Sequence, residues 1–436
     1  MKGLLRKIVV TMIFSMSSMA AFAADVPTID TGDTAWVLIA SALVMLMTPG
    51  LAFFYGGLVR RKNMLSVLMQ CFMILAVISL QWVLFGYSLS FAPGNGFIGG
   101  LQWLGLNGVE LSPYSDYSAT IPHQAFMIFQ AMFAIITPAL IIGAFAERMK
   151  FSTMVVFTLL WSTLVYAPVA HWVWGIGGWL RNLGALDFAG GTVVHINAGI
   201  AALVCALVIG KRKNYKNHPT HPHNLPFSVL GAGLLWFGWF GFNAGSSLSA
   251  NGLAVNAFVV TNTAAAAAAL SWACIEWFFA GKPTMLGTIT GAVAGLVAIT
   301  PAAGFVNIMG AIAIGLMVSV ICYVFVGIIK PKLGYDDTLD AFGVHGIGGI
   351  WGALATGLFA TKAVNSAGAD GLFYGNAHQF IVQLEAVAIT VAFSFVVTFV
   401  ILKVLDMIMG VRVSENDELL GLDLSQHNER AYTLVE

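Results

Sequence analysis

Residues 191–210 read GTVVHINAGIAALVCALVIG and carry no Asp, Glu, Lys or Arg and a single histidine, His195. An α-helix needs roughly 20 apolar residues to cross the hydrocarbon core of a bilayer, so this stretch is long and apolar enough to span it. The whole chain has the same character, because 58% of its 436 residues are hydrophobic and 9% are charged. Soluble domains carry roughly 25% charged residues. The composition therefore excludes an ordinary soluble protein and predicts one that crosses the membrane many times.

Apolar stretches of similar length recur along the chain after Asp33. We predict an all-α polytopic membrane protein with eleven transmembrane helices, within a domain at residues 24–409. Two inverted five-helix halves, about residues 34–215 and 225–365, precede a last helix at 378–409. The predicted spans are 34–58, 65–90, 123–145, 151–173, 191–210, 225–244, 254–280, 285–300, 306–329, 341–360 and 378–409.

The basic residues lie mostly in alternate connections between these spans. Fifteen Lys and Arg residues fall on one side of the membrane, and Arg181 and Lys362 fall on the other. Because basic connections are retained in the cytoplasm, we expect the mature N-terminus outside and the C-terminus inside. Residues 410–436 are then a cytoplasmic C-terminal tail. The net charge of zero argues against a nucleic-acid partner.

The first 23 residues have the pattern of a targeting segment. Lys2, Arg6 and Lys7 precede a short apolar stretch, and small residues then end in Ala21-Phe22-Ala23. This order of basic residues, apolar core and A-x-A site is typical of a secretory signal peptide that is cleaved. We expect the mature chain to begin at Ala24, with an uncleaved additional helix as the alternative.

The sequence predicts no cofactor and no resident metal. The stretch His218-Pro219-Thr220-His221-Pro222-His223 has no carboxylate or thiol neighbours, so we interpret it as a solvated loop. The cysteines lie in apolar runs, where we expect small buried hydrophobic residues instead of disulfide partners or zinc ligands. They are Cys71, Cys205, Cys274 and Cys322.

Two histidines lie inside predicted spans, His195 in the fifth and His345 in the tenth. An ionisable group at membrane depth is costly and marks a functional site. The two spans occupy corresponding places in the two halves, which is a recurring plan in transporters. The alternatives are two unrelated core histidines with separate hydrogen bonds, or ligands of a haem or metal, for which two histidines alone are a poor site.

An acidic residue precedes each histidine, Asp187 by eight positions and Asp340 by five. We expect each carboxylate to cap the N-terminus of its helix, where backbone N–H groups need acceptors. Such a cap also fixes the loop that leads into the histidine helix. Glu276 and Glu385 lie near or within spans, and we expect helix packing or interfacial hydrogen bonds for both.

Several long motifs, in the same order along the chain, resemble the ammonium transporter (Amt/Mep/Rh) family and specifically its bacterial Amt branch. The resemblance covers nearly the whole mature chain. The motifs are PGLAFFYGGL at 49–58, GAFAER at 143–148, DFAGGTVVH at 187–195, GWFGFNAGS at 238–246 and DAFGVHG at 340–346.

The resemblance implies a homotrimer with one conduction path in each subunit. It places an outer site that recruits ammonium at Phe133, Trp174 and Ser246, with Asp187 supporting it nearby. Aromatic faces attract a cation, and the Ser246 hydroxyl is an acceptor for one N–H of ammonium. From the residues alone, Phe133 and Trp174 would be ordinary core or interfacial aromatics.

The resemblance also implies a gate of two stacked phenyl rings, Phe133 and Phe242, and a midpore pair, His195 and His345. An intact cation meets a large desolvation cost in an apolar passage, whereas neutral ammonia does not. We therefore hypothesise that ammonium binds outside, loses a proton and crosses as ammonia. Paired imidazoles are suited to accept, relay or return that proton.

The segment GLDLSQHNERAY at 421–432 resembles the cytoplasmic tail of the family, which usually has glycine where this chain has Asn428. The resemblance implies that the tail and cytoplasmic loops engage a PII-type nitrogen signalling protein, and that the chain lies in the bacterial inner membrane. The leading function is an ammonium transporter or channel, and not an enzyme. The alternatives are a membrane ammonium sensor that signals through its tail, a Rh-type gas channel, and a membrane enzyme or haem protein.

Overall fold

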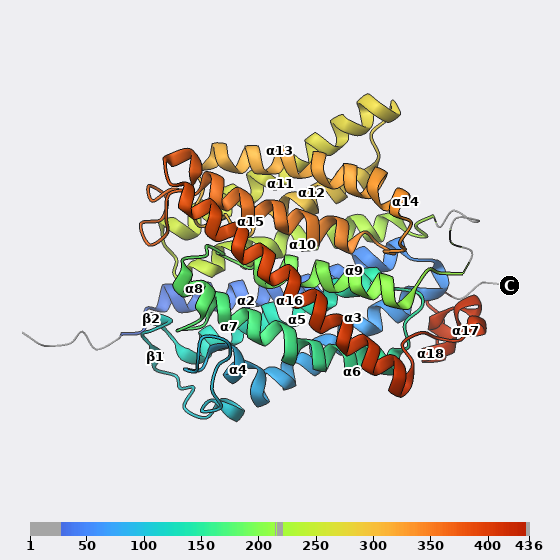
Figure 1. Cartoon of the computed structure of the whole chain (residues 1–436), viewed down its shortest axis with the longest axis horizontal. Coiled ribbons are helices and arrows are strands. Elements are labelled where there is room, and N and C mark those ends of the chain that lie inside the picture. Colours follow the sequence, from blue (N-terminus) through green and yellow to red (C-terminus); the bar gives the residue numbers. More distant parts are fainter. Residues whose placement is uncertain (1–27, 214, 216–220, 433–436) are drawn as a thin grey trace, which may run out of the picture.

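The computed structural model of the chain describes residues 28–213, 215 and 221–432. The predicted signal peptide, residues 1–23, lies outside this part of the chain. Helices dominate the described residues, and most run roughly along one direction to form a bundle (Figure 1). The described residues also include a small antiparallel hairpin of β1 (Pro113–Tyr114) and β2 (Ser118–Pro122), which the all-α prediction did not include.

The first half of the chain contributes helices up to residue 209. Segments labelled η are 3₁₀ or π-helical turns, and several of them continue a longer helix. In order the elements are α2 (Thr31–Leu58), η1 (Arg61–Asn63), α3 (Met64–Gln81), η2 (Trp82–Gly86), α4 (Tyr87–Phe91), η3 (Leu104–Leu106), α5 (His123–Phe145), α6 (Phe151–Trp161), η4 (Ser162–Tyr166), α7 (Ala167–Trp174), α8 (Trp179–Leu183), η5 (Gly191–Ile196) and α9 (Asn197–Ile209).

The second half and the tail contribute the remaining helices. They are α10 (Leu225–Ala244), η6 (Gly245–Ser247), α11 (Gly252–Ala280), α12 (Met285–Ile299), α13 (Ile308–Val324), η7 (Phe325–Ile329), α14 (Lys330–Leu333), η8 (Phe342–Gly346), α15 (Ile347–Phe359), η9 (Leu372–Tyr374), α16 (Ala377–Met409), α17 (Glu415–Leu420) and α18 (Leu422–His427).

Ten helical segments of the described residues are long and apolar enough to cross a membrane. The predicted span at 285–300 forms α12, a helix of 15 residues that packs against α11 and α13. At 1.5 Å per residue α12 is about 22 Å long, which is shorter than a hydrocarbon core of roughly 30 Å. The all-α polytopic membrane fold is confirmed, while the N-out, C-in orientation stays a prediction from charge.

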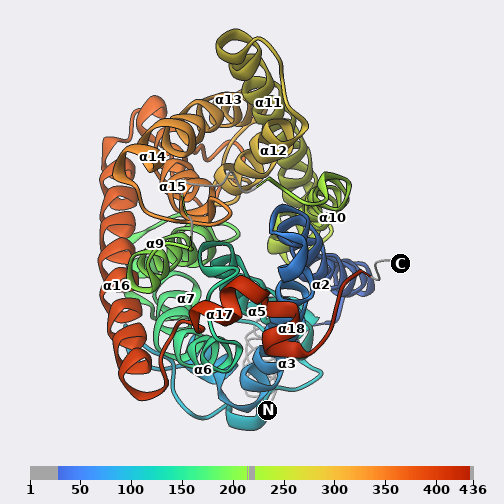
Figure 2. The same cartoon turned by 90° about the vertical axis from the view of Figure 1, so that its right-hand side faces the viewer.

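The bundle has two distinct ends. The tail helices α17 and α18 lie at one end, and β1, β2 and α8 lie at the other (Figure 1), and Figure 2 looks onto the tail end. Helix α16, 33 residues long, runs obliquely across the outside of the bundle (Figure 1). Helix α2 packs along α10, and α5 packs against both α2 and α9. Residues of α2, α5, η5, α10, α12 and η8 together line a narrow cavity inside the bundle.

The cysteine prediction is correct for three of the four side chains. Cys71, Cys205 and Cys322 are buried and free, whereas Cys274 is exposed. The prediction of burial for Cys274 is wrong because α11 turns that face away from the rest of the bundle. An apolar sequence does not distinguish a face that meets protein from one that meets lipid.

Candidate functional site

A cavity of about 220 Å³ lies at the end of the bundle that carries α8 and the hairpin. Phe133 of α5, Trp174 at the end of α7 and Ser246 of η6 all line it. The Phe133 and Trp174 rings lie 5.8 Å apart at 86°, edge to face. Ser246 Oγ donates to the carbonyl of Phe242 at 2.9 Å, so its oxygen lone pairs are available to a donor. The predicted orientation would place this cavity on the outer side of the membrane, and it is called the outer cavity below. It combines aromatic faces with a hydroxyl acceptor, the groups that attract a small N–H cation.

Trp174 is the tryptophan of its segment that lines the outer cavity. Its Nε1 donates to the carbonyl of Asp187 at 2.9 Å, which fixes the indole plane. Trp172 and Trp179 pack against each other with ring centroids 5.8 Å apart. The Trp172 indole donates elsewhere, to the carbonyl of Phe97 at 2.7 Å.

Asp187 caps the helix that carries His195, which confirms that prediction. Its buried carboxylate accepts the backbone N–H groups of residues 190–193 at 2.7–3.1 Å. These are donors that a helix start leaves without partners. Asp187 therefore supports the outer cavity through its backbone bond to Trp174 and supports the His195 helix through its side chain.

The passage below the outer cavity is closed by two phenyl rings. Phe133 and Phe242 lie with ring centroids 4.3 Å apart at 37°. Their exposed fractions are 1% and 0%. The structure thus places the two residues predicted for the gate in direct contact, with Phe133 facing both the outer cavity and Phe242.

The two predicted midpore histidines lie side by side beyond this gate. The rings of His195 and His345 are 5.4 Å apart and nearly parallel, at 17°. Trp239 also lies near His195, with ring centroids 5.5 Å apart at 22°. Among the described residues, neither ring nitrogen of His195 nor Nδ1 of His345 has a hydrogen-bond partner. The alternative of two histidines held by separate core hydrogen bonds therefore does not fit the structure.

The space around the histidine pair is narrow and apolar. A cavity of about 10 Å³ lies between Phe242 and His345. About 10–15 Å³ is the least that one water needs, so this space holds no hydrated ion. Its other lining residues are apolar or aromatic: Met47, Leu51, Phe54, Ile136, Leu140, Val194, Leu235, Trp239 and Val293, beside His195.

The cap of the second histidine helix is Asp337, and the prediction of Asp340 is wrong. Asp337 accepts the N–H groups of Ala341 and Phe342 at 3.1 and 2.8 Å. Asp340 instead has a left-handed backbone, with φ of 59°, and its carboxylate lies 2.5 Å from Lys330 Nζ. With Asp337, the acidic cap precedes the histidine by eight positions in both halves.

Both histidines sit in π-helical turns, η5 and η8, where their helices cross closely. A Cβ placed on Gly199 would lie 2.1 Å from the backbone N of Gly346. Only glycine permits this approach. The wide turns and the close crossing bring the rings of His195 and His345 together. Single π-helical turns are rare and often mark functional sites.

An inner cavity of about 360 Å³ continues from the histidine pair towards the tail end of the bundle. His345 lines both this cavity and the narrow one, so the two cavities adjoin at its ring. Carboxylates of Glu276 and Asp340 line the inner cavity. Glu276 accepts from Thr284 N at 2.6 Å and from Trp272 Nε1 at 3.2 Å, which confirms the expected hydrogen bonding. Glu385 is exposed on α16.

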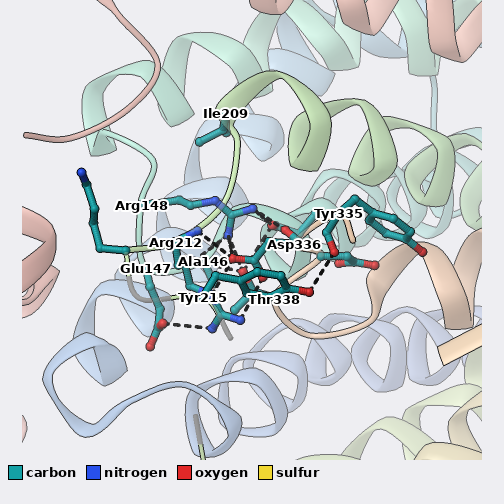
Figure 3. A network of polar contacts seen from close by, with 12 residues as sticks. Ala146, Glu147, Arg148, Ile209, Arg212, Tyr215, Tyr335, Asp336 and Thr338 are labelled. Carbon is teal, nitrogen blue, oxygen red and sulfur yellow. Dashed lines mark hydrogen bonds and ion pairs between the residues drawn. The ribbon is translucent and has the colours of Figure 1, made fainter. Parts of the chain in front are cut away.

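A buried ionic network joins the loops at the tail end of the bundle (Figure 3). Arg212 binds Asp336 through two nitrogens at 2.9 Å each and reaches Glu147 at 3.1 Å. Glu147 also accepts from Arg60 N and Nε at 2.7 and 3.0 Å. Burial opposes its charge, but Arg212 and Arg60 hold the pKa of Glu147 below its ordinary value. The network therefore contains fixed carboxylates that tie both halves together.

The tail packs onto these loops. Glu418 accepts from Lys213 N at 2.7 Å and pairs with Arg412 of the tail at 2.8 Å, and Asp423 accepts from Ser66 N at 2.8 Å. Asn428 ends α18 in a left-handed conformation, with φ of 54°. Asparagine tolerates this conformation better than most residues, so it can stand where the resemblance predicts glycine. Residues 218–220 of the predicted solvated loop lie outside the described residues. His223, at the end of that stretch, contacts the tail hydroxyl of Tyr432 at 2.9 Å.

Sequence reasoning missed a residue that holds the Asp187 loop from outside. Gln383 of α16 accepts from Leu186 N at 2.7 Å and donates to Leu186 O at 2.8 Å and Ala353 O at 3.0 Å. Its exposed fraction is 1%. A glutamine within an apolar span was the available signal, because a polar group at that depth needs partners.

Comparisons with known proteins agree with this arrangement. A model of the Ammonium Transporter Family matches residues 35–432. An ammonium transporter of Bacillus subtilis is 58% identical over 401 residues, covering 92% of this chain and 98% of the relative. The crystal structure of Candida albicans Mep2 is similar with a TM-score of 0.85 at 40% identity, covering 92% of this chain and 90% of that one.

A solved structure named a sensor Amt protein is also similar, with a TM-score of 0.83 at 30% identity, covering 91% of this chain and 98% of that one. The family match extends over nearly the whole described chain and includes both histidine helices. The chain therefore belongs to the ammonium transporter family, and this membership supports ammonium transport as its function.

Proposed function

We propose that the chain recruits ammonium at the outer cavity, transfers a proton from it to the His195–His345 pair and conducts neutral ammonia past that pair, which returns the proton to ammonia at the inner cavity. The observation that carries this proposal is the series of three cavities, about 220, 10 and 360 Å³, joined through the Phe133–Phe242 contact and His345. In this proposal Phe133, Trp174 and Ser246 bind the cation, and Asp187 holds their geometry.

The narrow middle section selects for an uncharged species. Moving an unpaired ion from water into an apolar medium costs several kcal/mol or more even after relaxation. Ammonia carries no charge and avoids that cost. Potassium has no proton to release, so the same section excludes it.

His195 and His345 are the proton-handling groups of the proposal. Their rings stack at 5.4 Å, and three of their four nitrogens have no partner among the described residues. A neutral imidazole has one donor and one acceptor nitrogen. The pair can therefore accept hydrogen bonds from a molecule in the passage and offer a proton to it, which are the two properties a relay requires.

The test uses purified protein in vesicles with ammonium pulses recorded electrically on a supported membrane. We expect His195→Ala and His345→Ala to lower the rate about tenfold or more, or to change the ammonium/potassium selectivity. His378→Ala, which removes an exposed histidine of α16, is the matched control. If both pore variants keep the rate and the selectivity of the parent, the relay is wrong.

We also propose a homotrimer in the bacterial inner membrane, whose tail and inner loops bind a PII-type signalling protein. The folded tail, held by the Arg412–Glu418 pair at 2.8 Å, supplies a fixed surface for such a partner. A pull-down from membranes with and without residues 411–436 tests the docking, and unchanged binding would refute a role of the tail.

A membrane ammonium sensor is the second candidate, favoured by the similarity to the solved sensor Amt protein. A sensor would change the exposure of its tail on ammonium binding without net flux. Protease protection of the tail, measured beside flux in the same vesicles, separates the two functions. A tail response with no flux supports the sensor.

A further inference from the structure

The outer cavity contains a positively charged side chain, although the ligand proposed to bind there is itself a cation. Arg181 of α8 lines the cavity together with Asp116. Arg181 Nη1 donates to the carbonyl of Trp174 at 2.8 Å, so the guanidinium is held next to the backbone of one recruitment aromatic. By charge count, the other basic residue of the predicted outer side is Lys362, which is not among the residues lining this cavity.

A guanidinium at this place has two effects of opposite sign on a bound cation. Its hydrogen bond to Trp174 holds the backbone that carries the indole, which favours binding. Its positive charge repels the cation that binds in the same cavity. The repulsion acts over several ångströms because solvent fills only part of the space between them. Asp116 lines the same cavity and attracts a cation by the same law.

We propose that Arg181 and Asp116 are opposed determinants of cation affinity at the outer site, with Arg181 weakening the affinity for ammonium and Asp116 strengthening it. The inference rests on the proposed function of the outer cavity. Both residues are exposed, so the effect is moderate and is reduced by salt. It acts on occupancy of the cavity by the cation and leaves the neutral species in the passage unaffected.

The consequence is a change of KM without a change of the maximal rate. An interaction made equally before and during the rate-limiting step alters KM alone. At low ionic strength we expect Arg181→Gln to lower KM about twofold to fivefold and Asp116→Asn to raise it by a similar factor. Arg181→Lys keeps the charge, so its KM should stay above that of Arg181→Gln. Raising the salt should bring all KM values together.

The experiment measures initial ammonium currents in vesicles across a concentration series at low and high ionic strength. Lys362→Gln removes the same charge outside the cavity and is the matched control, with an unchanged KM expected. The proposal is overturned if Arg181→Gln raises KM or leaves it unchanged, because then the bond to Trp174 outweighs the charge. It is also overturned if Lys362→Gln lowers KM as much as Arg181→Gln.

A further variant separates this inference from the proposed function. Trp174→Leu removes the aromatic face and should raise KM in every charge background. If Trp174→Leu raises KM and Arg181→Gln does not lower it, the outer site stands and the charge proposal fails. If Trp174→Leu leaves KM unchanged, the outer cavity is not the recruitment site, and the charge proposal falls with it.

Discussion

Replacing Gln383 by leucine should disturb the outer site from a helix that does not line it. Gln383 makes three hydrogen bonds of 2.7, 2.8 and 3.0 Å to the backbones of Leu186 and Ala353. Leucine fills a similar volume but leaves one N–H and two carbonyls without these partners. At about 1 kcal/mol net for each bond, Gln383→Leu should lower the free energy of unfolding by about 3 kcal/mol.

Gln379, one turn earlier on α16, provides a matched control. It donates to the carbonyl of Gly184 at 3.0 Å and makes a longer contact of 3.4 Å with Gln383. Gln379→Leu should therefore cost about 1 kcal/mol. The free energies are measured by denaturant titration of purified protein in detergent, with tryptophan fluorescence as the signal.

The functional effect follows from the loop that Gln383 holds. Leu186 precedes Asp187, which accepts the Trp174 indole at 2.9 Å and caps the His195 helix. Gln383→Leu should therefore raise KM for ammonium more than Gln379→Leu does. The reasoning is refuted if the two substitutions have equal effects on unfolding, or if Gln383→Leu destabilises the protein and leaves KM as in the parent.

Three further results are expected. Asp337→Ala, which removes two N–H acceptors, should cost about 1–2 kcal/mol of stability, whereas Asp340→Ala should cost under about 1 kcal/mol; equal losses in thermal unfolding would contradict the assignment of the cap. Burial lowers the pKa of His427 although Asp423 and Glu429 raise it, so the docked tail is favoured above the ordinary pKa of about 6.5 and loses this contribution as pH falls through the lowered value. Proteolysis of the tail should increase between pH 7.5 and 5, and His427→Gln should make that increase smaller. Burial raises the pKa of Asp423, so protonation of Asp423 favours the docked tail at lower pH, nearer the ordinary pKa of a carboxyl group. Gly199→Val should abolish transport, because even a Cβ there would lie 2.1 Å from Gly346 N; a variant that folds and transports normally would show that the close crossing is unnecessary.

Much of the fold was predictable because membrane spans are set by one physical requirement, a helix long and apolar enough to cross hydrocarbon. The same requirement made His195 and His345 conspicuous. It also placed α12 (Met285–Ile299) to within one residue, at 285–300. It did not predict the small hairpin of β1 and β2, because that hairpin lies outside the spans. Nor did it distinguish the buried Cys322 from the exposed Cys274, since apolar composition is common to lipid-facing and core-facing sides.

Site residues that lie within a sequence motif could be predicted, whereas residues that join the site only through tertiary contacts could not. The three acidic residues before His345 are Asp336, Asp337 and Asp340, and proximity favoured the wrong one. The eight-position interval between Asp187 and His195 was the better guide, since two related halves repeat their spacing. Gln383 has no local pattern that links it to Leu186, because the two residues meet only when α16 crosses the bundle.

The measurement that tests the central claim most directly compares potassium and ammonium flux through the unmodified protein in the same vesicles. The passage between Phe242 and His345, with about 10 Å³ of free space, has no room for a hydrated ion. The account predicts ammonium-driven current or uptake and no protein-dependent potassium flux at equal concentration and driving force. Potassium flux comparable with that of ammonium would show that intact cations cross, and deprotonation in a dry passage would be wrong.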